Sequence, residues 1–269
     1  MGRPEGQSLI VPELAAATRL LPAPVSDARQ LGGARRPWAI DYASTKAVLR
    51  WNDAARWRAF GFTDEDAVAS TEWLHALLRE LAAVGFTAPY PIDDLDGRSF
   101  VAVDGGIWEL LSHVPGEPMG WSHREMFEAG ALLARFHDAA QRLTRRAQRP
   151  GAQPFADCAP GHSEARGLRA AFDREFAQLR PEWTKRGVIH GDATQSNVVV
   201  DDHGSYHLVD FALAYVDHVL ADTGSALWRN GRASPDSIVY DPARAAGFVR
   251  GYASVRPLGP GAGRAIVTF

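Results

Sequence analysis

Three residues with oxygen-bearing side chains, Asp192, Asn197 and Asp210, occur within one short stretch late in the chain. Carboxylate and amide oxygens suit Mg²⁺, which usually takes one or two protein ligands and fills its other positions with water and phosphate oxygens. Asp192 lies five residues before Asn197, in a loop that contains Gly191, and would add a carboxyl group near the same point. These residue types predict a metal site for phosphate-bearing ligands without specifying a reaction.

A β-hairpin is expected to position Asn197 and Asp210. Two β-rich apolar runs flank the polar stretch 201–205, which is typical of strands joined by a turn. The runs are 198–200 and 206–209. A turn centred on His203 and Gly204 would place Asn197 opposite Asp210 at the open end of the hairpin. Cross-strand neighbours have Cβ atoms about 4.5–5.5 Å apart, so the amide oxygen and the carboxylate would converge.

The first part of the chain is typical of antiparallel strands around a glycine turn. Strands are expected at 25–31, 38–42 and 47–51, with Gly32 and Gly33 between the first two. Such a turn lets backbone N–H groups approach phosphate oxygens, although a bare Gly-Gly pair is also typical of an ordinary hairpin. The third strand places Arg50 on one face with Lys46 and Val48. That cation could hold phosphates or be a solvated edge charge, and the sequence leaves both open.

Two lobes are expected from the change in pattern along the chain. A helix over 69–84 with a leucine stripe and a hairpin over 99–114 complete a first half that is mostly strands. Pro115-Gly116-Glu117-Pro118 is the strongest break, and helices dominate after it. We therefore expect an N-terminal nucleotide-binding lobe at 1–114, with a hinge at about 110–116, and a C-terminal catalytic and substrate-binding lobe at 115–269. Helices of the second lobe are predicted at 124–143, 163–179 and 242–252.

Composition restricts the class of protein. The chain has 269 residues, of which 46% are hydrophobic and 23% charged, and its net charge is −3. These values are ordinary for a soluble enzyme and do not support binding to nucleic acid or to an anionic membrane. A single cysteine, Cys158, excludes an intrachain disulfide, so a cytoplasmic location is expected. No run approaches the ~18 apolar residues of a membrane-spanning helix.

The motif residues resemble those of the aminoglycoside phosphotransferase and choline kinase family, whose fold is similar to that of protein kinases. The family pattern is HGD-x4-N, a short hairpin, an Asp-Phe or Asp-Trp pair, and an Asp that opens a helix. In this chain the pattern corresponds to His190-Gly191-Asp192, Asn197, Asp210-Phe211 and Asp222. The resemblance implies an α+β, bilobal fold: a small antiparallel-sheet N-lobe with one main helix and a larger, mostly helical C-lobe.

The resemblance also implies a role for each motif residue. Asp192 would be the catalytic base that accepts the proton of a substrate hydroxyl. Asn197 and Asp210 would hold Mg²⁺. His190 and Asp222 would support the loop.

Weaker similarity extends over most of the chain. Leu31-Gly32-Gly33 resembles the family's nucleotide loop, and Val48-Leu49-Arg50 resembles the strand that carries a phosphate-binding cation. Ser112 and Val114 fall where the family's hinge offers backbone groups to adenine. The resemblance therefore implies ATP and Mg²⁺ as cofactors.

Several positions depart from the family pattern. Arg50 stands where many relatives have Lys, although it keeps the charge and offers a fork of donors. The helix position expected for the glutamate that pairs with this cation holds Leu74, and neither Glu72 nor Glu80 lies cleanly on that helical face. The pairing is therefore absent or supplied from elsewhere. Because the family normally has more helix beyond the last residue of this chain, the second lobe is expected to be truncated at its end.

These observations predict an ATP- and Mg²⁺-dependent O-phosphotransferase that acts on an alcohol group of a small molecule. An antibiotic, such as an aminoglycoside, ranks first among the acceptors on family frequency alone, with homoserine, choline or a sugar as alternatives. Asp217, Asp236 and Asp241 could bind a cationic acceptor or be surface charges. A non-catalytic nucleotide-binding protein on the same fold is the alternative of a different class. A protein kinase is disfavoured because no Ala-Pro-Glu sequence follows Asp210.

Overall fold

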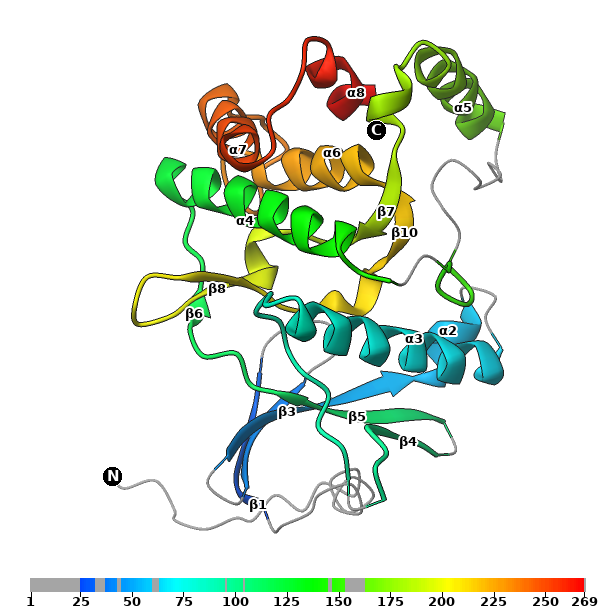
Figure 1. Cartoon of the computed structure of the whole chain (residues 1–269), viewed down its shortest axis with the longest axis vertical. Helices are drawn as coiled ribbons and strands as arrows, with labels where there is room; N and C mark the ends of the chain where they lie inside the picture. The colour runs from blue at the N-terminus through cyan, green and yellow to red at the C-terminus, as the bar shows by residue number, and fades with distance from the viewer. Residues whose placement is uncertain are drawn as a thin grey trace. The chain divides into compact units, whose positions relative to one another are not determined.

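A computed structural model describes most of the chain, which divides into two compact units (Figure 1). The described ranges are 25–31, 37–42, 45–59, 63–94, 96–103, 105–144, 147–152 and 163–268. The first unit comprises residues up to His75 together with Tyr90–His113, and the second comprises Ala76–Pro89 and Val114–Phe269.

The first unit is built on one antiparallel sheet. Its strands are β1 (Val25–Gln30), β2 (Trp38–Tyr42), β3 (Thr45–Asp53), β4 (Phe100–Val103) and β5 (Gly106–Ser112). The strand order is β1-β2-β3-β5-β4, and every neighbouring pair is antiparallel. The predicted strands and the predicted hairpin over 99–114 are therefore confirmed.

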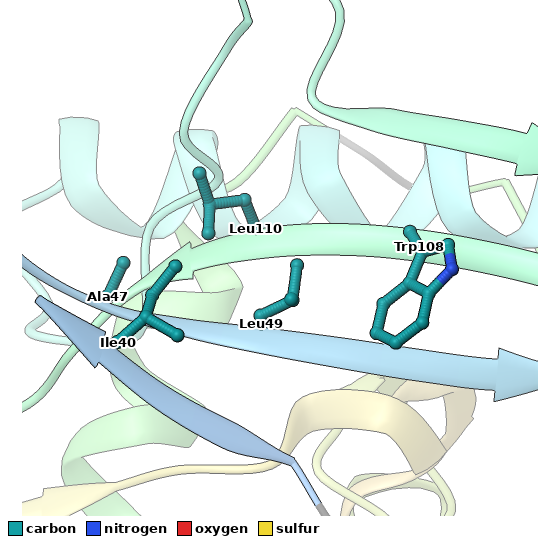
Figure 2. Close-up of a cluster of buried hydrophobic side chains, with 5 residues drawn as sticks. All are labelled: Ile40, Ala47, Leu49, Trp108 and Leu110. Atoms are coloured by element: carbon teal, nitrogen blue, oxygen red, sulfur yellow. The ribbon is translucent and has the colours of Figure 1, made fainter. Parts of the chain in front are cut away.

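One face of this sheet carries the apolar core of the unit. Ile40, Ala47, Leu49, Trp108 and Leu110 form a buried cluster contributed by β2, β3 and β5 (Figure 2). Because side chains alternate across a strand, the residues between them point to the opposite face. On that opposite face, the β3–β5 register places Arg50 beside Glu109.

Helix α3 (Asp64–Ala83) begins five residues earlier than the leucine stripe predicts. The reason is a reciprocal cap: the Thr63 hydroxyl accepts the N–H of Asp66 at 3.0 Å, and the Asp66 carboxylate accepts the N–H of Thr63 at 2.9 Å. The helix ends before Gly85, whose φ is +79°, as the sequence predicts. A short helix, α2 (Ala54–Ala59), precedes it.

The second unit is mostly helical. Its helices are α4 (His123–Gln141), α5 (Ser163–Phe176), α6 (Val219–Asn230), α7 (Pro242–Val255) and α8 (Ala262–Thr268). Its strands are β6 (Glu117–Pro118), β7 (Arg186–Ile189), β8 (Val198–Val200), β9 (Tyr206–Leu208) and β10 (Tyr215–His218). Three-residue 3₁₀ helices are η3 (Pro181–Trp183), η4 (Gln195–Asn197) and η5 (Phe211–Leu213).

Helices α4 and α7 lie side by side and form the framework of this unit (Figure 1). Ser122 and Glu125 form a capping box that starts α4. Glycines allow the two backbones to approach, since a Cβ on Gly130 would lie 2.0 Å from the Phe248 oxygen and one on Gly251 would lie 1.9 Å from the Phe127 oxygen. Helices α4 and α7 are thus closely packed at these two glycines.

The hairpin β8–β9 forms where the sequence predicts it, but its register is shifted by one residue. Val199 lies opposite His207, whereas a turn centred on His203 and Gly204 would place it opposite Leu208. The predicted pairing of Asn197 with Asp210 is therefore wrong. The backbone oxygen of Asn197 instead accepts the N–H of Val209 at 2.9 Å.

The loop of the hairpin explains the shift. The Asp201 N–H donates to the Ser205 oxygen at 3.0 Å, and Gly204 has a φ of +77°. The Asp201 carboxylate also accepts the N–H groups of His203 and Ser205, at 2.9 and 2.8 Å. Three residues with a left-handed glycine therefore form the turn, where the sequence predicts two.

Candidate active site

Asp222, in the first turn of α6, holds the backbone of the loop that carries Asp192. Its carboxylate accepts the N–H of His190 at 2.8 Å and the N–H of Gly191 at 3.0 Å. His137 of α4 adds a bond from Nε2 at 3.1 Å. Burial by itself would raise the pKa of Asp222, but the hydrogen bonds from His137 and His190 outweigh burial and place the pKa below its ordinary value. An ionised, fully enclosed carboxylate therefore fixes the loop.

His190 connects the same loop to the hairpin. Its Nδ1 accepts the N–H of Asp192 at 3.3 Å, and its Nε2–H donates to the oxygen of Val209 at 3.1 Å. This pattern requires a neutral ring protonated on Nε2. Burial lowers the pKa of His190, in agreement with the neutral form. These two hydrogen bonds join the loop to the hairpin, and a supporting role for His190 stays a prediction.

Gly191 is required by the conformation of this loop. Its φ is +76°, and a Cβ there would lie 2.2 Å from the backbone oxygen of Leu213. Gly204 provides a matched comparison, because its φ is +77° but nothing lies within 4 Å of the corresponding Cβ position.

We predict that Gly191→Ala destabilises the protein more than Gly204→Ala. Both changes place a side chain in the left-handed region, at a cost of about 1–2 kcal/mol. Only Gly191→Ala also forces a backbone clash, which adds about 1–3 kcal/mol. Urea denaturation of the two variants measures the difference. Equal midpoints would show that the loop relaxes around the substituted alanine without cost.

Asp192 and Asn197 come together within the loop. The Asn197 amide nitrogen donates to the backbone oxygen of Asp192 at 2.8 Å and to its Oδ2 at 3.0 Å. Because the amide nitrogen is committed to Asp192, the amide oxygen is the group left for a metal. The second carboxylate oxygen of Asp192, Oδ1, accepts a hydrogen bond from Arg229 Nη1 at 2.6 Å. The sequence did not single out Arg229, which is 37 residues away along the chain.

Asp210 follows β9 in an unusual backbone conformation. Its φ is +54°, and it is the one non-glycine residue with a positive φ among those the structure describes. Its carboxylate accepts the N–H of Ala212 at 3.4 Å. Non-glycine residues in this region cost of order 1–3 kcal/mol and cluster at functional sites. The strain supports the predicted metal-binding role of Asp210.

The oxygen donors of Asp210 and Asn197 are of the kind that Mg²⁺ accepts. Asp210 offers a carboxylate and Asn197 an amide oxygen, and their binding of a metal stays a prediction. Mg²⁺ is usually bound by one or two carboxylates together with phosphate oxygens of the nucleotide.

In the first unit, Arg50 has a partner that the sequence did not reveal. Arg50 on β3 lies opposite Glu109 on β5, and its Nε donates to Glu109 Oε1 at 2.7 Å. Asn52 donates to the same oxygen, and His75 of α3 bonds to Oε2 at 2.8 Å. The helix thus supplies a histidine, and the neighbouring strand supplies the carboxylate. Of the two alternatives left open by the sequence, a missing partner for Arg50 or a carboxylate from another element, the structure shows the second.

This cluster is buried. Glu109 is 0% exposed and Arg50 is 5% exposed. Burial alone would raise the pKa of Glu109, but Arg50 and the hydrogen bond from His75 outweigh burial and hold the pKa well below its ordinary value. His75 is in turn bonded through Nδ1 to Ser99 Oγ at 2.7 Å. The orientation of Arg50 is therefore determined by a network of three elements.

The structure gives little information on the other residues predicted to bind the nucleotide, which are Gly32, Gly33, Ser112 and Val114. Gly32 and Gly33 lie outside the described residues. The Ser112 N–H already donates to the Tyr90 oxygen at 2.7 Å, so that donor is used within the first unit. Val114 begins the second stretch of the second unit, and its contact with adenine stays a prediction.

Two of the acidic residues considered for a cationic acceptor have structural roles. Asp217 is buried, and it accepts hydrogen bonds from the Tyr215 hydroxyl at 3.0 Å and the His218 N–H at 2.7 Å. Asp241 caps α7 by accepting the N–H groups of Ala243 and Arg244.

The fold is protein-kinase-like. The sequence pattern of the phosphotransferase enzyme family matches residues 36–258, and the chain belongs to that family. Among the described residues, no helix is long and apolar enough to cross a membrane.

Curated relatives of this chain include homoserine kinases. One from Gluconacetobacter diazotrophicus is 30% identical over 202 residues, covering 71% of this chain and 62% of the relative. One from Gluconobacter oxydans is 28% identical over 200 residues, covering 69% of this chain and 62% of the relative. The chain thus spans less than two thirds of the length of these relatives.

Solved structures with the same fold are more distant in sequence. An amicoumacin kinase in complex with AMP-PNP and Ca²⁺ has a TM-score of 0.69 at 15% identity, over 95% of this chain and 82% of that one. An aminopropanol kinase has a TM-score of 0.68 at 21% identity, over 93% of this chain and 82% of that one. These similarities establish the fold.

Proposed function

We propose that the protein is an ATP- and Mg²⁺-dependent kinase that phosphorylates a hydroxyl group of a small molecule. The observation that carries this proposal is the hydrogen bond from Asn197 Nδ2 to Asp192 Oδ2, at 3.0 Å. It lies on a loop held by the buried carboxylate of Asp222. With the proposed roles of Asp192 as base and Asn197 as metal ligand, this contact supports the arrangement that phosphoryl transfer requires. Membership of the phosphotransferase enzyme family supports the same reaction class.

The roles of the residues follow from their chemistry. Asp192 orients the acceptor hydroxyl and takes its proton as the acceptor oxygen bonds to the γ-phosphorus. The bond between that phosphorus and the β–γ bridging oxygen breaks, and ADP leaves. Arg50 and the backbone around Gly32 and Gly33 hold the triphosphate. Positioning and electrostatic stabilisation supply most of the rate in this kind of transfer.

Asn197 and Asp210 would hold Mg²⁺. The ion, when bound, neutralises negative charge on the phosphates. Asn197 also keeps Asp192 oriented through its amide nitrogen, so one side chain serves both the metal and the base.

Two kinds of acceptor are proposed. Homoserine is supported by the names of the curated relatives. An antibiotic hydroxyl, ranked first on family frequency, has support only from distant structural neighbours such as the amicoumacin kinase. We therefore place a homoserine-like acceptor first.

A panel assay tests the proposed function. The protein is incubated with Mg-ATP and, in turn, homoserine, choline, aminoglycosides, a peptide antibiotic and sugars, and ADP release is followed. We expect release that depends on one class of acceptor and on Mg²⁺. Tight ATP binding without release for any acceptor would instead support a non-catalytic nucleotide-binding protein.

A further inference from the structure

A positive charge lies directly beside the proposed base. Arg229, in the last turn of α6, donates from Nη1 to Asp192 Oδ1 at 2.6 Å. The Arg229 side chain is 47% exposed and that of Asp192 is 22% exposed. Both groups are therefore accessible to a small molecule in solution.

The position of Arg229 is built into the fold. The next residue, Asn230, is buried; its Oδ1 accepts the N–H of Gln195 at 2.8 Å and its Nδ2 donates to the Ala193 oxygen at 2.9 Å. These two bonds attach the end of α6 to the loop on the far side of Asp192. Arg232 Nε also donates to the Arg229 backbone oxygen at 3.0 Å. The backbone that carries Arg229 is thus fixed beside Asp192.

The charge and the geometry of Arg229 favour an anionic group on the acceptor. A guanidinium has five N–H donors in a planar fork that matches a carboxylate, and its bond to Asp192 uses one nitrogen. An ammonium group at the same place would be repelled by Arg229. Of the three acidic residues considered for a cationic acceptor, Asp217 and Asp241 accept hydrogen bonds within the fold, and Asp236 is exposed.

We propose that Arg229 binds a carboxylate of the acceptor, so that the preferred acceptor is a short hydroxy acid whose hydroxyl reaches Asp192. This inference rests on the proposed phosphotransfer and adds the residue that selects its acceptor. Without the acceptor, Arg229 rests on Asp192. With the acceptor, the substrate carboxylate takes the remaining donors of the guanidinium beside the base.

Three acceptors that differ only in their charged groups provide the test. L-Homoserine has an amine and a carboxylate, 4-hydroxybutyrate has only the carboxylate, and 3-amino-1-propanol has only the amine. Binding to the protein with Mg²⁺ and AMP-PNP is measured by calorimetry, and ADP release is measured separately with Mg-ATP. We expect both hydroxy acids to bind more tightly than the amino alcohol.

Arg229 variants assign the preference to this residue. A charge-assisted hydrogen bond contributes about 1.5–3 kcal/mol. Arg229→Gln should therefore weaken binding of the hydroxy acids by roughly 10–100-fold and leave 3-amino-1-propanol unchanged or improved. Arg229→Lys, which keeps the charge but not the fork, should fall between. Arg250→Gln, on the exposed surface of α7, is the matched control and should match the wild type.

The outcomes separate the two proposals. Equal losses for all three acceptors in Arg229→Gln, or tighter binding of the amino alcohol by the wild type, would overturn the carboxylate site. Failure of both hydroxy acids to bind would overturn it as well. Arg229-dependent binding of hydroxy acids without ADP release would support the carboxylate site and overturn the proposed phosphotransfer.

Discussion

Asp192→Asn is expected to lower kcat by about 10²–10⁴-fold, the range for loss of a general base. The amide has the shape of the carboxylate, so the loop held by Asp222 and His190 stays in place. It cannot take the proton of the acceptor hydroxyl. The KM for ATP is expected to change little, because Asp192 is not assigned to the nucleotide. Steady-state ADP release with the best acceptor of the panel measures both constants.

Asp202→Asn is the matched control for this prediction. Asp202 is an exposed carboxylate in the turn of the β8–β9 hairpin, so its replacement removes the same charge from the same part of the fold. We expect its kcat to equal that of the wild type. A kcat for Asp192→Asn within tenfold of wild type would show that the base has been wrongly assigned.

The sequence predicted those features that local residue types determine. Gly85 ends α3 through a left-handed backbone conformation that this one residue type favours. The family resemblance grouped His190 to Asn197 as one motif, and the roles of its residues stay predictions. Three-dimensional contacts agree, with Asp192 and Asn197 in direct hydrogen-bond contact.

Features that depend on distant residues were not predicted. Glu109 could be paired with Arg50 only once the β3–β5 register was known, because 59 residues separate them. The predicted hairpin register was wrong because the Asp201 side chain organises a three-residue turn in place of a two-residue turn. One additional residue in the turn changes every cross-strand pair. Arg229 meets Asp192 only because Asn230 attaches α6 to the loop.

Glu109→Leu is expected to reduce the free energy of unfolding by about 3–5 kcal/mol, the usual result of removing one partner of a buried ion pair. The change leaves the Arg50 charge enclosed without its carboxylate, and it removes the acceptor of His75 and Asn52. The double variant Arg50→Met with Glu109→Leu removes the buried charge as well. We therefore expect the double variant to be more stable than the single variant, although it has lost more polar contacts.

The stabilisation provided by Glu109 is expected to depend on pH. The pKa of Glu109 is lowered in the folded protein, so its ionisation stabilises the fold above the ordinary pKa of about 4.3 and this contribution is lost as the pH falls below that value. The stability difference between the wild type and Glu109→Leu should therefore be largest near neutral pH and decrease in acid. Urea denaturation from pH 7 down to pH 3 measures the difference.

Nucleotide affinity distinguishes the stabilising role of this cluster from its proposed role in holding phosphates. If Arg50 holds the triphosphate, the double variant should recover stability yet bind Mg-ATP at least about tenfold more weakly than the wild type, since a charge-assisted bond to phosphate is lost. Calorimetric titration with Mg-ATP measures this affinity on the folded double variant. Wild-type affinity in a stable double variant would restrict Arg50 and Glu109 to a structural role, because the phosphates would then be held without the Arg50 guanidinium.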